Sequence, residues 1–441
     1  MRMMALAMVA LTAGGSAAVA QEQPAPSPVE LTLATAVAQA LELNPNLAAV
    51  REDLPAARAR LRMAHSQGQP VASANLSLST GTMGMVLSGA DDVMPKALTT
   101  APGASRADAN LTFMYPLYTG GRIGSSVSAA RYKLRATQAD IDAMVLEVAY
   151  QVRQAYWQVL LSREMLRVQE ENLAAQEERL RVDQASLDAG KLPLYYVQRD
   201  KAELATAQQG LTNAQRDVAT ALLDLNVAIG LPPSTPLELA DQLVYDPAAA
   251  EVDEKGLLAS ALESRPEAEA LRASLEAAGR EVRSRRAAYQ PQIEGMLMFE
   301  GTKQSGMGAD AGYLAGVIAS LPILDGGSRR AGVWEARAMA RRTEKELAVL
   351  NLEIERQLRA AVLDLRAANR NVRTATEAVA AAEEDNRVAL ARYRAGKAIN
   401  LEAISALATL VQARTNLAQA LFDYNVAVDA VKKAAGKLPP A

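Results

Sequence analysis

Tyr115-Pro116-Leu117-Tyr118-Thr119-Gly120-Gly121-Arg122 returns 206 residues later as Leu321-Pro322-Ile323-Leu324-Asp325-Gly326-Gly327. The same offset aligns Arg131 with Arg337, Gly190-Lys191 with Gly396-Lys397, and Gly230 with Gly436. This register holds without a gap over 115 residues, from 116 to 230, which chance composition does not maintain. The chain is therefore internally duplicated, and each copy of the quoted stretch stands at the same point of a repeat.

A second register extends the duplication toward the N-terminus. At an offset of 221, Ala40-Leu41-Glu42, Pro45 and Pro70 meet Ala261-Leu262-Glu263, Pro266 and Pro291. The 15-residue difference is taken up between Pro70 and Pro116, where residues 83–105 are rich in Gly, Ser, Thr, Ala and Pro and predict an exposed loop. We expect a first repeat at 21–230, a linker at 231–252 and a second repeat at 253–441, each repeat beginning with a short helical region.

Apolar residues recur every seven positions after each quoted stretch. In the first repeat, residues 122–188 contain no proline. A 3.5-residue period kept this long predicts left-handed coiled coils, and a helix from Ile123 to Asp188 would be about 100 Å long. Long helical hairpins are expected at about 122–230 and 327–436. The heptad positions are Val145, Val152, Val159, Leu166, Leu173, Leu180 and Leu187, then Val197, Leu204, Leu211, Val218 and Leu225, and in the second repeat Leu358, Leu365, Val372, Val379, Leu410, Leu417 and Tyr424, with Asn351 and Asn386 as interruptions.

Strand patterns stand where the heptads stop. Residues 110–118 place Leu111, Phe113, Tyr115 and Leu117 on one face, and residues 72–79 alternate in the same way. Their duplicates at 292–301 and 312–324 alternate more loosely, with Glu294 and Glu300 on the polar face. Strand pairs are therefore expected at about 71–119 and 292–324, and the strands have roughly the 9 to 11 residues that cross a bilayer at a tilt.

Four strands are too few to close a barrel. An open sheet edge is not tolerated in lipid, and barrels begin at about eight strands. No apolar run approaches the roughly 18 to 20 residues of a membrane-spanning helix. If the chain enters a membrane it does so as strands, and several chains must share one barrel. The predicted class is an α+β membrane protein.

Composition excludes several other classes. Half of the chain is hydrophobic but only 4% is aromatic, which suits closely packed thin helices. A formal charge of −3 and a pI of 5.6 provide no basic surface of the kind that nucleic-acid binders use. The absence of Cys excludes disulfides, thiolate metal sites and lipoprotein acylation.

The N-terminus has the pattern of a secretory signal peptide. Arg2 precedes an apolar stretch, and Ala18-Val19-Ala20 matches a small-residue cleavage site, so residues 1–20 are predicted to be removed on export. Residues 21–28 then form a lead-in to the first repeat.

Together these motifs resemble the TolC-like outer-membrane efflux proteins. The resemblance rests on the two strand-to-helix junctions, on Asn44-Pro45 and Arg265-Pro266 after an Ala-Leu helix, and on the turns Asp188-Ala189-Gly190-Lys191 and Arg394-Ala395-Gly396-Lys397. It spans essentially the whole mature chain. At the junctions, Gly120, Gly121, Gly326 and Gly327 permit tight turns, while Pro116 and Pro322 are expected to end the strand ladders.

The resemblance implies a homotrimer with a 12-stranded β-barrel in the outer membrane and an α-helical tunnel in the periplasm. A periplasmic adaptor and an inner-membrane transporter would dock below. The implied role is the passive, gated exit duct of a tripartite efflux or type I secretion system, without a cofactor or metal. It leaves open the cargo and the cognate pump.

The two helical turns are the candidate entrance and adaptor contact, by resemblance. Their residues are Asp188, Gly190, Lys191, Arg394, Gly396 and Lys397. Glycine capping of a helix end explains the same turns without any docking partner.

Tyr393 and Glu402 are the candidate gate and pore residues. Similar channels place a tyrosine at the position of Tyr393 that helps hold the entrance closed, although Tyr393 also occupies a heptad position and can simply pack. The acidic partner that the family places on the first tip falls at Tyr196, so that latch is not preserved. Three copies of Glu402 would make a negative ring favouring cations, but a solvated Glu fits as well, and Ser405 replaces a second acidic ring of some relatives.

Other residues and other classes are weaker candidates. His65 is expected at a surface or in packing, Trp157 and Trp334 in packing, and Glu170-Glu171 on a solvated helix face. A trimeric adhesin and a periplasmic adaptor remain alternatives, although neither predicts two strand pairs inserted between helices. With one His and neither a phosphate-binding glycine loop nor a Ser/His/Asp set, the sequence predicts no enzyme.

Overall fold

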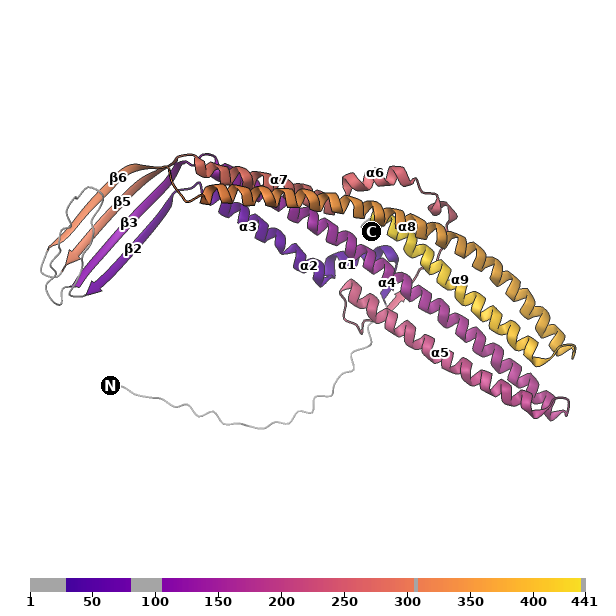
Figure 1. Cartoon of the computed structure of the whole chain (residues 1–441). Helices are drawn as coiled ribbons and strands as arrows, with labels where there is room; N and C mark the ends of the chain where they lie inside the picture. The colour runs from indigo at the N-terminus through magenta and orange to yellow at the C-terminus, as the bar shows by residue number, and fades with distance from the viewer. Residues whose placement is uncertain (1–28, 81–104, 305–307, 438–441) are drawn as a thin grey trace, which may run out of the picture.

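The computed structural model describes residues 29–80, 105–304 and 308–437. The expected signal peptide at 1–20 and the lead-in at 21–28 lie outside these residues. So does the loop expected at 83–105, except for Ser105. Figure 1 shows an elongated, bent molecule with a β-sheet at one end and the turns of two long helical hairpins at the other.

The elements follow the duplication. The first repeat contains β1 (Val29–Leu31), α1 (Leu33–Leu43), α2 (Pro45–Arg51), α3 (Asp53–Ser66), β2 (Val71–Thr80), β3 (Ser105–Tyr118), α4 (Arg122–Asp188) and α5 (Leu194–Ile229). Residues 231–252, expected as a linker, include β4 (Leu237–Leu239) and η1 (Pro247–Ala250). The second repeat contains α6 (Glu254–Ser264), α7 (Pro266–Arg286), η2 (Ala287–Tyr289), β5 (Gln292–Gln304), β6 (Ala309–Ser320), α8 (Ser328–Arg394) and α9 (Asn400–Ala434).

The two strand pairs form one antiparallel sheet in the order β2-β3-β5-β6. Because side chains alternate along a strand, the register decides which of them share a face. One face is almost wholly apolar and collects Ala72, Ala74, Leu76, Leu78, Ala109, Leu111, Phe113, Leu297, Phe299, Tyr313, Ala315 and Val317. The other face carries Ser73, Asn75, Ser77, Asp108, Asn110, Thr112, Glu294, Glu300, Thr302 and Asp310, with Met296, Met298 and Leu314 among them.

Each strand continues into a helix at the same end of the sheet. The helices next to the sheet contact one another in the order α3-α4-α7-α8, which repeats the strand order. This part of the molecule is therefore a single layer, and both of its faces are open to solvent. Farther along, α4 pairs with α5 and α8 pairs with α9, so the layer becomes two hairpins.

The largest buried core lies midway along the molecule. It packs Leu31, Val37 and Leu47 against Val152, Tyr156 and Leu225. Strand β4 pairs in parallel with β1, and the buried Tyr156 hydroxyl donates to Leu31 O at 3.0 Å and to Asp241 Oδ2 at 2.7 Å. The segment between the repeats therefore ties the N-terminal strand onto α4.

The strand-to-helix turns are glycine turns, as predicted. All four glycines have positive φ, from 57° at Gly120 to 89° at Gly327. They are nevertheless not equivalent. A Cβ on Gly120 would lie 2.3 Å from Gln290 Cβ, whereas a Cβ on Gly326 would meet nothing within 4 Å.

The expectation that proline ends the strands is wrong for the first repeat. Strand β3 continues through Pro116 to Tyr118, with an irregularity in its pairing to β5 between these two residues. β2 pairs with β3 only as far as Met114, so Pro116 lies where β3 has a neighbour on one side, and a missing N–H is tolerated there. In the second repeat β6 ends at Ser320, before Pro322.

The expectations for the two tryptophans and the single histidine have different outcomes. Trp157 is buried, and its indole N–H donates to Asp429 Oδ2 at 2.8 Å. Trp334 is exposed and lies beneath Arg330, so its expected packing role is wrong. His65 is exposed near the end of α3. None of the helices in the described part of the chain is long and apolar enough to cross a membrane.

Candidate functional site

The two hairpin turns have the same backbone. Helix α4 ends with Gly190 at φ 73° and with hydrogen bonds from Lys191 N to Ser186 O and from Gly190 N to Leu187 O, both 2.8 Å. Helix α8 ends with Gly396 at φ 69°, Lys397 N bonded to Arg392 O at 2.8 Å, and Gly396 N bonded to Tyr393 O at 2.9 Å. This is the Schellman motif, which satisfies the last carbonyls of a helix through a left-handed glycine.

The predicted tip residues surround these turns and face solvent. Asp188, Lys191, Arg394 and Lys397 are all exposed, and Asp188 accepts a hydrogen bond from Gln184 at 3.0 Å. Exposed apolar side chains accompany them: Leu194 and Tyr195 on α5, and Ile399 and Leu401 at the start of α9. The two tips therefore present an amphipathic surface at the end of the molecule farthest from the sheet (Figure 1).

Tyr393 does not simply pack. Its hydroxyl contacts both carboxylate oxygens of Asp183 on α4, at 2.7 Å and 2.6 Å. Asp183 is 1% exposed, so the tyrosine supplies a donor to a charge that water does not reach. The resemblance to the family places the acidic partner at Tyr196, whereas in the structure the acid that Tyr393 contacts is Asp183, near the end of α4.

Three further buried polar residues join this contact. Asn400, at the first residue of α9, donates to Asp183 Oδ2 at 3.3 Å and to Asp200 Oδ1 at 3.1 Å. Arg179 on α4 lies with its Nε 3.4 Å from Asp200 Oδ1, and both side chains are buried. We call Arg179, Asp183, Asp200, Tyr393 and Asn400 the clasp, because they join α4 and α5 to α8 and α9.

The clasp places two carboxylates and one guanidinium in a buried site. Burial, and then the hydrogen-bonding contact with Asp183, raise the pKa of Asp200 to about 6. Burial lowers the pKa of Arg179, although the nearby Asp200, Glu203 and Asp183 oppose this change. Burial and the Asp183 carboxylate raise the pKa of the Tyr393 hydroxyl, so it stays a donor. The group that changes charge near neutral pH is therefore Asp200.

Some clasp atoms lack partners. Arg179 Nε, Asp200 Oδ2 and Asn400 Oδ1 are buried without a hydrogen bond among the described residues. Unsatisfied buried polar atoms cost free energy, roughly 1–3 kcal/mol each.

Glu402 lies beside the clasp but outside it. It is exposed in the first turn of α9, and its Oε2 is 3.6 Å from Arg392 Nη1. The ion pair reduces the net negative charge that a single copy presents. Ser405 lies one turn further on and is also exposed.

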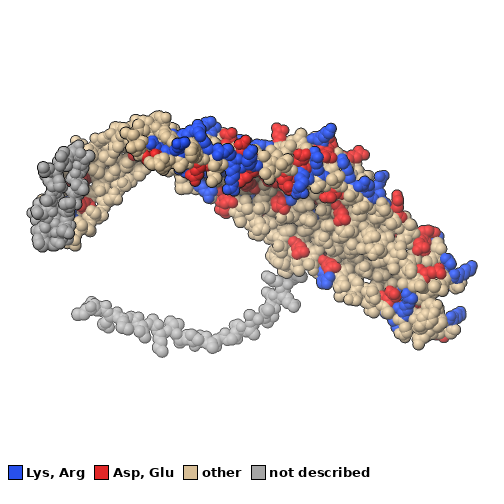
Figure 2. Space-filling view, in the orientation of Figure 1, with Lys and Arg blue, Asp and Glu red and all other residues tan. Residues whose placement is uncertain are grey.

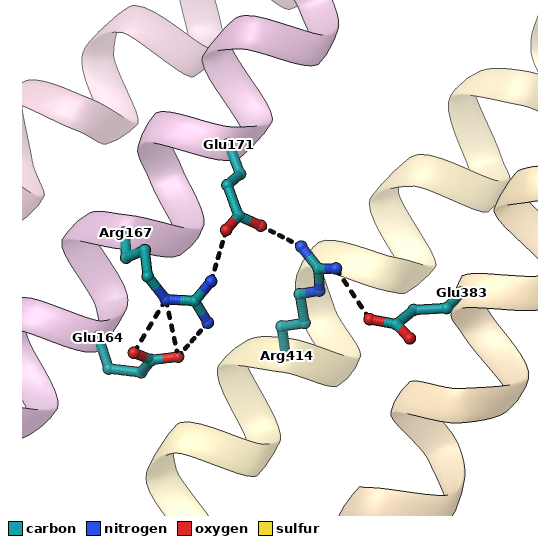
Figure 3. Close-up of polar contacts among 5 residues, drawn as sticks. All are labelled: Glu164, Arg167, Glu171, Glu383 and Arg414. Atoms are coloured by element: carbon teal, nitrogen blue, oxygen red, sulfur yellow. Dashed lines mark hydrogen bonds and ion pairs between the residues drawn. The ribbon is translucent and has the colours of Figure 1, made fainter. Parts of the chain in front are cut away.

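A second polar contact joins the hairpins farther from the tips. Figure 3 shows Arg414 of α9 between Glu171 of α4 and Glu383 of α8, while Arg167 of α4 bonds Glu171 and Glu164. Arg414 Nη2 is 2.8 Å from Glu383 Oε1. The interpretation of Glu170-Glu171 as a merely solvated face is therefore wrong for Glu171, which forms an ion pair with the opposite hairpin.

The described residues offer no site for a metal. No group of three or more His, Asp or Glu residues in ranges 29–80, 105–304 and 308–437 is arranged to hold an ion. The clasp holds one carboxyl group, that of Asp200, whose pKa is raised to about 6 by burial and by its contact with Asp183.

Sequence reasoning found Tyr393 and missed the other four members of the clasp. Asp183 and Asp200 each follow a heptad position, Leu180 and Val197, by three residues, which is the second core position of the heptad, where a charged residue is unusual. Arg179 directly precedes Leu180, at a flanking position where charged residues are common, so the sequence gives no signal for it.

Comparison with known proteins covers most of the chain. The family model described as outer membrane efflux protein matches residues 36–231 and 257–437. The outer membrane efflux protein BepC of Brucella suis biovar 1 is 27% identical over 328 residues, covering 73% of this chain and 70% of BepC.

Solved structures share the fold. The Campylobacter jejuni CmeC outer membrane channel superposes with a TM-score of 0.79 at 15% identity, covering 98% of this chain and 94% of that one. The Neisseria gonorrhoeae MtrE outer membrane channel, solved in its open state, superposes with a TM-score of 0.74 at 19% identity, covering 92% and 89%.

Proposed function

Because the chain belongs to the outer membrane efflux protein family, we propose that it forms the exit duct of a tripartite efflux or type I secretion system. The family membership locates it in the outer membrane, with its helical part in the periplasm. The adhesin and adaptor alternatives are not favoured.

The observation that carries the proposal is the shape of the sheet. Its four strands have one apolar and one polar face, and β2 and β6 each have a single strand neighbour. Leu76, Leu78 and Val317 on the apolar face are 71%, 76% and 66% exposed in the single chain. Three copies joined edge to edge make twelve strands, with the apolar faces toward lipid and the polar faces toward water.

The absence of Cys makes this assembly testable by disulfide cross-linking. Single cysteines on the edge strands, one at Ser77 of β2 and one in turn at Gly312, Leu314 or Gly316 of β6, should link neighbouring chains for at least one pairing. The control pair Asn75→Cys and Asn110→Cys lies on directly paired residues of β2 and β3 and should link within one chain. Detergent-solubilised protein giving only within-chain links and a monomeric mass would refute the trimer.

The clasp is the proposed periplasmic gate. It joins the two hairpins of one chain through Tyr393 and Asn400, close to the tips. Separating the hairpins breaks these bonds and hydrates Asp183 and Asp200, so the closed state is held by the clasp and opening is favoured when a partner binds the tips. The exposed residues Leu194, Tyr195, Ile399 and Leu401, together with the charged tip residues, suit a periplasmic adaptor, which in turn would connect to an inner-membrane transporter.

Single-channel conductance in planar bilayers tests the gate. Trimers should give small, mostly closed pores, and conductance should rise on Tyr393→Phe. No conductance from correctly assembled trimers of any clasp variant would rule out the duct.

Glu402 is the proposed pore acid. Its exposure and its position in the first turn of α9 suit a ring at the entrance, while Arg392 moderates its charge. Glu402→Gln should weaken block by divalent cations, and Arg392→Gln should strengthen it. Equal block in the wild type and in both variants would remove Glu402 from the pore.

A further inference from the structure

The helices next to the sheet are strongly basic. We define the collar as residues 56–66 of α3, 122–136 of α4, 276–286 of α7 and 328–342 of α8, which together hold sixteen Arg or Lys residues and three acidic residues. The remainder of the chain has thirty-one basic and forty-seven acidic residues. A chain with a net charge of only −3 therefore concentrates a large positive charge in one band. The inference from net charge that the chain has no basic surface is wrong for this band, because the net charge averages over its whole length. Figure 2 shows Lys and Arg gathered over these helices, beside a nearly uncharged sheet.

The collar charges are available for binding. Thirteen of the sixteen basic side chains are exposed, and Arg122, Arg280 and Arg329 are partly buried. Within the described residues eleven of the sixteen make no ion pair; the five that do are Arg135, Arg280, Arg285, Arg329 and Arg342. The three acidic residues of the collar are too few to neutralise its sixteen basic residues.

The collar begins where the apolar surface of the sheet ends. Leu117, Tyr118, Tyr289 and Ile323 are exposed at this boundary. Two of the first arginines past it are held against aromatic rings, with Arg329 5.0 Å from the Tyr289 centroid and Arg330 4.5 Å from the Trp334 centroid. Aromatic side chains followed by cations are typical of the boundary between hydrocarbon and headgroups.

From this arrangement we propose that the collar binds anionic phospholipid headgroups of the inner leaflet of the outer membrane. Positive side chains attract phosphate oxygens, and each Lys or Arg near an anionic membrane surface adds to the attraction. The inference rests on the proposed function, since the barrel sets the depth of the collar.

Two further observations favour lipid over an anionic cargo in the duct. The polar face of the sheet carries four acidic residues, Asp108, Glu294, Glu300 and Asp310, against one basic residue, Arg106, so the face that would line the duct has a net negative charge and repels anions. Glu294 lies at the collar end of this face. In the trimer, α3 of one chain would lie beside α8 of the next, because these helices border β2 and β6. Both are basic, so this seam needs anions from outside the protein.

The test compares lipid retention by intact detergent-solubilised trimers, measured by native mass spectrometry with phosphatidylglycerol, cardiolipin and phosphatidylethanolamine as probes. The collar variant carries Arg283→Gln, Arg286→Gln and Arg341→Gln. The control carries Arg199→Gln, Arg370→Gln and Arg373→Gln, three exposed arginines on helices α5 and α8 outside the collar. The wild type and the control should prefer both anionic lipids, and the collar variant should lose that preference by about tenfold or more.

Further variants distinguish loss of charge from misfolding, and competition with inorganic phosphate distinguishes lipid binding from binding of soluble anions. Replacing the same three collar arginines by lysine should keep the preference, since lysine retains the charge; loss of preference in this variant would overturn the proposal. So would an unchanged preference in the glutamine variant, or displacement of the lipid by inorganic phosphate at equal concentration. Conductance is recorded on the same trimers: conducting trimers without lipid preference overturn only this inference, whereas absent trimers overturn the proposed function.

Discussion

The two hairpins share a backbone but carry complementary side chains at their tips. The first contributes Arg179, Asp183 and Asp200 to the clasp, and the positions 206 residues later are Asp385, Ala389 and Ala406. The second contributes Tyr393 and Asn400, and the matching positions in the first are Leu187 and Leu194. Duplication thus preserved the glycine turns, which fix the backbone, while the buried polar residues diverged. The two hairpins therefore meet through unlike surfaces: the first supplies the carboxylates, and the second supplies the hydroxyl and amide groups that donate hydrogen bonds to them.

The largest expected effect comes from removing the only cation of the clasp. Arg179→Met leaves Asp183 and Asp200 buried without a counter-charge, which should destabilise the packing of the tips by about 3–5 kcal/mol. Hydrogen exchange of the tip amides measures this. The control Arg181→Met, two residues away and 77% exposed, should cost less than about 1 kcal/mol. Equal effects of the two variants would mean that burial at Arg179 does not matter.

A pH dependence should follow from Asp200. Its pKa is about 6 in the folded chain, above the ordinary value of 3.8, so between roughly pH 4 and 6 the folded state holds more protons than the opened one. The clasp should therefore become more stable as pH falls from 7 to 5, by about 1–1.5 kcal/mol, and by about another 1 kcal/mol between pH 5 and 4, with little further gain from this group at lower pH.

Asp200→Asn isolates this contribution. The variant cannot titrate at this position, so the difference between its stability and that of the wild type should change across pH 5–7. A constant difference over that range would show that Asp200 titrates near its ordinary pKa. Native hydrogen exchange, or the closed fraction in bilayers, provides the measurement.

Tyr393→Phe should have a smaller effect than Arg179→Met. It removes the hydroxyl that contacts both oxygens of Asp183 and should cost about 1.5–3 kcal/mol, since the lost bonds go to a charged acceptor. The matched control is Tyr195→Phe on the first tip, where the side chain is 62% exposed and the cost should be within about 0.5 kcal/mol. If Tyr393→Phe leaves the stability of the tips unchanged, only a packing role remains for this residue.

Because the two tip turns have the same backbone, the same glycine substitution should destabilise the protein equally at both. Gly190→Ala and Gly396→Ala should each cost about 1–2 kcal/mol, because both positions have positive φ and an added Cβ would meet nothing within 4 Å. Gly230→Ala should cost more, since its Cβ would lie 2.6 Å from Leu43 O. Thermal unfolding of the three variants checks this order. A clear difference between the two tip variants would show that the turns are not equivalent.

The smallest effect is expected at the exposed contact between the hairpins. Arg414→Gln removes its ion pairs to Glu171 and Glu383 and should cost at most about 1 kcal/mol, less at high salt, because these side chains are partly hydrated. A cost as large as that of Arg179→Met would mean that position along the hairpin, rather than burial, sets the strength of the contact.

Much of the architecture was determined by the sequence alone. The heptads and the glycine turns are local patterns, and α4 at Arg122–Asp188 matches the helix expected from Ile123 to Asp188. The bounds of the fourth strand were predicted less well: it was expected at 312–324, and β6 lies at Ala309–Ser320. Its many Ala and Gly residues give a weak alternation of apolar and polar positions, so its ends are hard to place from the sequence. The prediction that Pro116 ends its strand was wrong, because a strand can hold a proline where a neighbouring strand pairs with it on one side only, and the sequence does not show which strands are neighbours.

The clasp and the collar exist only in the tertiary structure, because each is made of residues from segments that are far apart in the sequence. Asp183, Asp200 and Tyr393 are far apart in the sequence, and only the packing of the two hairpins brings them together and removes water, which gives a carboxyl group an altered pKa. The sixteen basic residues of the collar lie in four separate segments, each with more basic than acidic residues, and only the packing of the four helices brings these charges into one band. The sequence fixes periodic and local features, because these depend on residues a few positions apart, whereas burial and summed charge depend on which segments meet in space.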